Sequence, residues 1–161
     1  MQLNLTWKKG FFSNNCILYK NGELIGNLRE KSFSNTAVAE LNGKGFLFRT
    51  KGFFKQHTDI IDSSTNQVLG EISYNNWKSK ATISGRNKTV NWSYNNFWNT
   101  KWSLSDQNGI EIKYAGSSTK GSIQSNTDDA LLILSGLYVT NYYWQISAAV
   151  VVAICIPILA S

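Results

Sequence analysis

The single histidine of the chain lies close to two carboxylates, a combination that acid–base chemistry could use. His57 stands with Asp59 and Asp62 in the segment QHTDIID. Because side chains alternate along a β-strand, His57 and Asp59 would share one face while Asp62 would point to the other. A His–Asp pair can transfer protons, but this strand-like segment favours an exposed pair on the surface of a sheet. We therefore interpret the pair as structural.

The other residues that could carry chemistry have simpler explanations. Asp128 and Asp129 could act as paired carboxylates, yet they precede an apolar segment, where carboxylates stabilise the N-terminus of a helix. Cys16 and Cys155 have no basic neighbour at short range in the sequence that would activate a thiolate. The sequence contains no CxxC, HExxH, Walker-loop or GxGxxG motif. We expect no enzymatic activity, no metal and no cofactor.

The composition describes one folded domain with an uneven charge distribution. The chain has 161 residues, 42% of them hydrophobic and 13% aromatic, which excludes intrinsic disorder. Two cysteines exclude a small disulfide-rich scaffold. The N-terminal segment does not resemble a secretory signal, so we expect a cytoplasmic location. The net charge of +6 comes from residues 1–129, because no charged side chain follows Asp129.

Alternation of apolar and polar residues with period two predicts strands throughout residues 1–126. The pairs Asn21-Gly22, Asn42-Gly43 and Asn108-Gly109 are typical of two-residue hairpin turns. The regular spacing of strands and turns is typical of a barrel or a sandwich. We predict twelve strands, at 2–7, 15–20, 23–28, 36–41, 44–50, 56–62, 67–74, 79–84, 88–94, 99–106, 109–115 and 117–124.

The segment 128–145 predicts a helix that is apolar on every side, with Asn126 or Thr127 as its N-cap. Such a helix must be surrounded by protein or by lipid. Roughly eighteen residues give a length of about 27 Å, which matches the height of a barrel built from strands of this length. A barrel of twelve strands is wide enough to hold it. We therefore predict an all-β fold, a twelve-stranded antiparallel barrel that encloses a C-terminal hydrophobic α-helix.

The strand series through Ile123 and the segment DDALLILSGLYVTNYYWQ (128–145) together resemble a known family layout. It is that of the tubby C-terminal-like superfamily, which includes tubby proteins, phospholipid scramblases and LURP-one-related proteins. The resemblance implies a tubby-like barrel over residues 1–145 with a central helix at 128–145. It also implies association with membranes or phosphoinositides rather than catalysis. The apolar extension 146–161 departs from this layout, and no tubby-type phosphoinositide motif can be matched residue by residue.

Five of the six connections that follow odd-numbered strands carry aromatic residues, and most of these also carry Lys or Arg. The connections after even-numbered strands are short and polar. Aromatic side chains suit the depth of lipid headgroups, and cations attract anionic lipid. The alternative is that the aromatic side chains fold inward and plug the barrel. The lipid-binding residues that we predict on this rim are Lys8, Lys9, Phe11, Phe12, Lys51, Phe53, Phe54, Lys55, Trp77 and Trp98.

The tail 146–160 contains about fifteen apolar residues, or nineteen when it is counted from Tyr142. A membrane span needs about twenty, so the tail is either a short membrane anchor or a segment that packs back on the barrel. Nucleic acid is disfavoured as a partner, since the basic residues are spread out and only three are Arg. We expect a non-enzymatic module at a membrane surface that binds anionic phospholipid. The alternative is a soluble protein–protein interaction or regulatory barrel.

Overall fold

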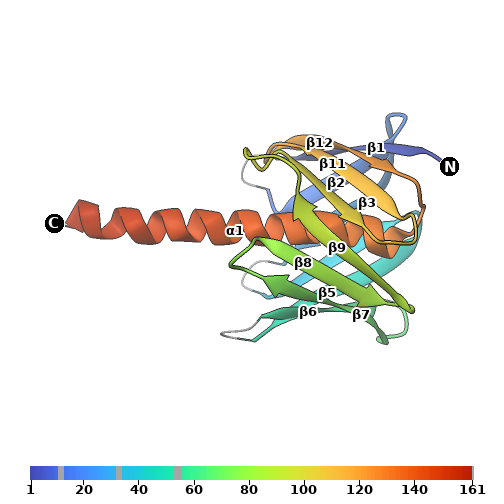
Figure 1. Cartoon of the computed structure of the whole chain (residues 1–161), viewed down its shortest axis with the longest axis horizontal. Helices are drawn as coiled ribbons and strands as arrows, with labels where there is room; N and C mark the ends of the chain where they lie inside the picture. Colours follow the sequence, from blue (N-terminus) through green and yellow to red (C-terminus); the bar gives the residue numbers. More distant parts are fainter. Residues whose placement is uncertain (11–12, 32–33, 53–55, 161) are drawn as a thin grey trace.

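The computed structural model describes residues 1–10, 13–31, 34–52 and 56–160, with the backbone alone described for 149–160. It confirms the predicted fold, a closed antiparallel barrel of twelve strands around a C-terminal helix (Figure 1). Each strand pairs with its neighbours in sequence, and β12 closes the barrel against β1 with Leu5 opposite Ile123. The strands are β1 (Leu3–Lys9), β2 (Asn15–Lys20), β3 (Glu23–Glu30), β4 (Thr36–Leu41), β5 (Lys44–Lys51), β6 (His57–Asp62), β7 (Val68–Asn75), β8 (Lys80–Gly85), β9 (Lys88–Tyr94), β10 (Lys101–Ser105), β11 (Glu111–Gly116) and β12 (Lys120–Ser125).

Strand boundaries differ most from the prediction around the last turn. The sequence pattern predicts the twelfth strand from residue 117, but Ser117 to Thr119 form the turn, and the Ser117 N–H donates to the Lys120 carbonyl at 2.9 Å. The period-two pattern itself is confirmed. Trp7, Phe48 and Trp92, for example, point into the barrel and are 2% exposed or less.

Helix α1 (Ala130–Ala160) begins two residues later than predicted and has a different N-cap. Asp129 caps it, because its carboxylate accepts hydrogen bonds from the backbone N–H groups of Leu131 at 3.1 Å and Leu132 at 3.4 Å. The prediction of Asn126 or Thr127 as cap is wrong. Asn126 is engaged elsewhere, donating from its amide to the Gly109 carbonyl at 2.6 Å and so bracing the preceding hairpin.

Inside the barrel the helix is held by polar contacts as well as by apolar packing. Tyr114 donates from its hydroxyl to the Ile133 carbonyl at 2.9 Å, and the indole N–H of Trp92 donates to the Gly136 carbonyl at 3.2 Å. A Cβ atom on Gly136 would overlap the phenol of Tyr114. Glycine therefore lets the helix approach the β11 wall closely enough for these hydrogen bonds to form.

Beyond Tyr143 the helix leaves the barrel without a break and continues outward (Figure 1). Aromatic side chains surround it at this point. Tyr142 stacks on Tyr74 with ring centroids 3.8 Å apart, and Trp144 meets Trp102 edge to face at 5.6 Å. Ile146 still packs against the core, and the backbone that follows extends away from the strands as far as Ala160 (Figure 1).

Within the residues whose side chains are described, no helix combines the length and the apolar character needed to cross a membrane.

We predict that Gly136→Ala lowers the free energy of unfolding by about 1–3 kcal/mol, because overpacking against Tyr114 costs more than the roughly 1 kcal/mol gained in helix propensity. Ser135→Ala is the matched control. Ser135 is fully buried, and its hydroxyl has no hydrogen-bond partner among the described residues, so its removal should leave stability unchanged or raise it. Chemical denaturation of both variants tests this. A Gly136→Ala variant as stable as the wild type would contradict the close-packing argument.

Candidate functional site

The site that the sequence predicts lies at the end of the barrel where helix α1 emerges, which we call the exit end. The connections after the odd-numbered strands all lie there, since neighbouring strands run in opposite directions. The helix starts after β12 at the opposite end, the entry end, and crosses the barrel (Figure 1). At the exit end the Tyr142 hydroxyl donates to the Gln56 side chain at 2.8 Å, and the Tyr143 hydroxyl donates to the Lys80 carbonyl.

Three large aromatic side chains at the exit end are exposed to solvent. Trp77 is 95% exposed, Phe97 89% and Trp98 78%, and the last two rings meet edge to face at 5.5 Å. For these residues the inward-plug alternative is wrong. The predicted residues Phe11, Phe12, Phe53, Phe54 and Lys55 lie outside the described part of the chain.

Asn96 explains why Phe97 and Trp98 stand outward. Its side-chain carbonyl accepts hydrogen bonds from the backbone N–H groups of Thr100 at 3.0 Å and Lys101 at 3.1 Å. Its amide also donates to the Thr100 hydroxyl at 2.7 Å. These bonds close the loop across its base, and Asn99 follows with a positive φ of 56°, so the two aromatic residues occupy the tip of a fixed turn.

Exposed basic residues lie at the same end as these aromatic residues, whereas most carboxylates lie at the entry end together with Lys20, Lys44, Arg86 and Lys88. Three of the basic residues at the exit end, Lys80, Lys101 and Lys120, stand at the first positions of strands. The sequence analysis missed them because it considered only the connections. The exposed basic residues at the exit end are Lys8, Arg29, Lys31, Lys51, Lys78, Lys80, Lys101 and Lys120. The carboxylates at the entry end are Glu23, Glu40, Asp62, Asp106, Glu111, Asp128 and Asp129.

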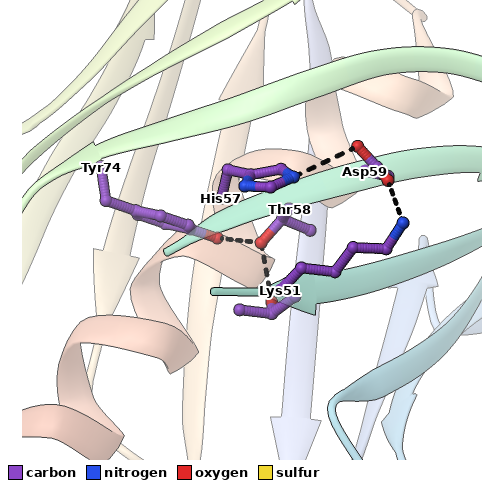
Figure 2. A network of polar contacts seen from close by, with 6 residues as sticks. Lys51, His57, Thr58, Asp59 and Tyr74 are labelled. Carbon is purple, nitrogen blue, oxygen red and sulfur yellow. Dashed lines mark hydrogen bonds and ion pairs between the residues drawn. The ribbon is translucent and has the colours of Figure 1, made fainter. Parts of the chain in front are cut away.

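Two of the predicted basic residues, Lys8 and Lys51, have partners on the barrel wall, and Lys8 Nζ lies 5.9 Å from the centre of the Tyr19 ring. Lys51 lies 3.1 Å from Asp59, whose other carboxylate oxygen is 3.9 Å from His57 Nε2 (Figure 2). His57 and Asp59 therefore share the outer face, as predicted, within a surface ion cluster. Lys9 is partly buried and lies opposite Cys16 in the β1–β2 ladder.

On the inner side of the same strands, a chain of hydroxyl groups ties the helix to the barrel wall. Thr50 lies 2.6 Å from the Tyr138 hydroxyl and 2.7 Å from the Thr58 hydroxyl, and Thr58 lies 2.7 Å from Tyr74. Figure 2 shows the contact between Thr58 and Tyr74 together with the ion cluster. Burial raises the pKa of Tyr74 and of Tyr138. Both phenols therefore remain protonated at neutral pH, and these contacts are structural.

The thiol of Cys16 faces the barrel interior and is not activated. Burial raises its pKa to about 12, and the nearby positive charge of Lys9 offsets this only in part. The thiolate, which is the reactive form of cysteine, is therefore scarce at neutral pH. Among the side chains that the structure describes, the exit end combines exposed aromatic with exposed basic groups.

We predict that replacing Trp77, Phe97 and Trp98 together by Ser leaves the midpoint of chemical unfolding close to that of the wild type. Exposed positions contribute little to folding, roughly 0.5 kcal/mol each or less. Trp102→Ser is the control, since that indole is fully buried and its loss should cost about 3 kcal/mol or more. A large loss of stability in the triple variant would mean that the three aromatic side chains pack on the barrel.

Comparison of the chain with models of protein families, with curated proteins and with solved structures finds no match. The resemblance to the tubby C-terminal-like superfamily stays a prediction that rests on the order of the elements.

Proposed function

We propose that this protein is a non-enzymatic module that associates with a membrane surface and binds anionic phospholipid through its exit end. One observation carries the proposal: exposed aromatic residues, exposed basic residues and the emerging helix all lie at the same end of the barrel. The opposite end is rich in carboxylates and lacks this combination.

The exposed aromatic residues suit the interface between water and lipid. Large apolar side chains that gather on a protein surface usually mark a site of interaction. Trp is favoured at headgroup depth, because its ring is amphipathic. Trp77 and Trp98 stand at the tips of two separate turns, which suits contact with a plane rather than with a pocket.

The separation of charge along the barrel axis would orient the molecule on an anionic surface. Each basic residue near such a surface contributes about 1 kcal/mol, and the carboxylates of the entry end would be repelled by it. Basic residues beside a membrane anchor are typical of the cytoplasmic side, so we propose that the barrel lies on that side.

The apolar tail is proposed as a short anchor. Residues 146–160 contain no charged side chain and follow Tyr142, Tyr143 and Trp144 after the single residue Gln145. This order, from barrel to aromatic residues to apolar helix, matches the order from water through headgroups to hydrocarbon. We also propose membership of the tubby C-terminal-like superfamily, which the barrel with its threaded helix supports.

We predict that reversing four exit-end charges weakens binding of the full chain to anionic vesicles by about tenfold or more at low salt. The variant carries Lys78→Glu, Lys80→Glu, Lys101→Glu and Lys120→Glu. Its matched control carries Lys20→Glu, Lys44→Glu, Arg86→Glu and Lys88→Glu, which changes the net charge equally but at the entry end. Sedimentation with vesicles that contain phosphatidylserine measures both, and the control should bind much more tightly than the exit-end variant.

Equal weakening in the two variants would contradict an oriented exit end and indicate a response to net charge alone. Full-length protein that binds no vesicles of any composition would contradict the membrane proposal. It would favour the alternative, a soluble interaction barrel that uses Phe97 and Trp98 to contact a protein.

A further inference from the structure

A cavity of about 230 Å³ lies at the exit end between helix α1 and the ends of β3, β4 and β5. It is smaller than the pockets of roughly 300–1,000 Å³ that hold drug-sized ligands, so it suits a small group. Its wall combines polar side chains with the apolar side chains of Ala37 and Ile146. The polar residues that matter here are Glu30, Thr36, Thr50, Gln56, Tyr138 and Gln145.

Glu30 is the acidic residue that lines this cavity. The Gln145 amide donates to one of its carboxylate oxygens. The ion pairs of the described residues join Lys51 and His57 to Asp59 and Lys113 to Glu111, and none includes Glu30. A carboxylate has about four acceptor positions, and among the described residues the Gln145 amide occupies one of those of Glu30. Glu30 is negatively charged, whereas most exposed ionic side chains at the exit end are basic.

Other acceptors line the same space. Gln56, Thr36 and Thr50 line the cavity. The Gln56 side-chain oxygen accepts from the Tyr142 hydroxyl, and the Thr50 hydroxyl also contacts Tyr138 and Thr58. A primary ammonium has three donors and no acceptor, which matches one carboxylate with neighbouring neutral oxygens. A quaternary ammonium prefers open aromatic faces. Here the ring of Tyr138 stacks on Phe48 at 4.8 Å, and the ring of Tyr142 stacks on Tyr74 at 3.8 Å.

We propose that this cavity binds a primary ammonium group, with Glu30 as the anionic partner and Gln56 and Thr50 as neutral acceptors. If the proposed function holds, the exit end faces lipid headgroups, and phosphatidylethanolamine is then the source that the position favours. A free ethanolamine phosphate ester presents the same group, and the experiment below distinguishes the two sources.

The first measurement is a calorimetric titration in which glycerophosphoethanolamine is added to the full-length protein in a nonionic detergent. We expect saturable binding that Glu30→Gln weakens by about tenfold or more, the range for loss of a charge-assisted hydrogen bond. Glu40→Gln is the matched control, because that carboxylate is exposed near the entry end, and it should bind as the wild type does. Equal binding of glycerophosphocholine, no binding of glycerophosphoethanolamine, or full binding by Glu30→Gln would each overturn the proposal.

The second measurement identifies whether the ammonium group comes from a lipid or from a soluble ester. It compares nanodiscs of phosphatidylcholine with and without phosphatidylethanolamine, neither of which carries a net lipid charge. A lipid source is supported if phosphatidylethanolamine shifts the NMR signals of the side-chain amides of Gln56 and Gln145, and if this shift is absent in the Glu30→Gln variant. Perturbation by the soluble ester alone supports the free source. Perturbation by neither overturns the site.

The two proposals fail separately. Glu30→Gln removes a negative charge, so its binding to anionic vesicles should be unchanged or stronger while its ammonium binding falls. Loss of anionic-vesicle binding is expected only from the exit-end charge reversals. If those reversals have no effect while Glu30→Gln still abolishes ammonium binding, the membrane proposal fails and the ammonium site stands.

Discussion

The structure depends on the enclosure of a helix that has no polar side. The buried part of α1 carries apolar residues around its whole circumference, and Ile133, Leu134 and Val139 are fully buried. Such a helix cannot lie on a protein surface in water. A closed ring of twelve strands supplies an apolar wall on every side, and the helix in turn fills an interior that the strand side chains alone would leave open.

Enclosure and strand number together fix the direction in which the chain leaves. After an even number of antiparallel strands the chain is back at the end where it started, so the helix must cross the whole barrel before it can emerge (Figure 1). It therefore emerges among the connections that follow odd-numbered strands. The same connections and adjoining strand ends carry Trp77, Phe97, Trp98 and most of the exposed lysines. Topology thus turns a basic chain with scattered aromatic residues into a molecule with two chemically different ends.

Much of this could be predicted from the sequence, because period-two alternation and Asn-Gly turns are local signals. The sequence does not show which of the polar residues from Asn126 to Asp129 caps the helix. Asn126 is not the cap because its amide donates to the Gly109 carbonyl, seventeen residues earlier in the chain. Lys80, Lys101 and Lys120 were missed for a different reason. They lie close to the starts of predicted strands, and only the connections between strands were considered as parts of the rim.

The cavity beside Glu30 has no signal in the sequence at all. It is built by residues from β3, β4, β5, the segment before β6 and the helix, and the Gln145–Glu30 contact joins positions 115 residues apart. The sequence presents Glu30 as one charge among the basic residues of a connection. Its orientation into a polar cavity emerges only when the helix is in place.

Labels at the two ends of the barrel would test the central claim, that the exit end faces the membrane. The background is Cys155→Ala, in which the buried Cys16, with its pKa raised to about 12, does not compete for a thiol-reactive fluorophore. Fluorophores placed at Phe97→Cys and, separately, at Asn108→Cys in the opposite turn are exposed to spin-labelled lipid in anionic vesicles. We expect strong quenching at position 97 and little at position 108. Equal quenching at both positions, or stronger quenching at 108, would contradict a membrane-facing exit end.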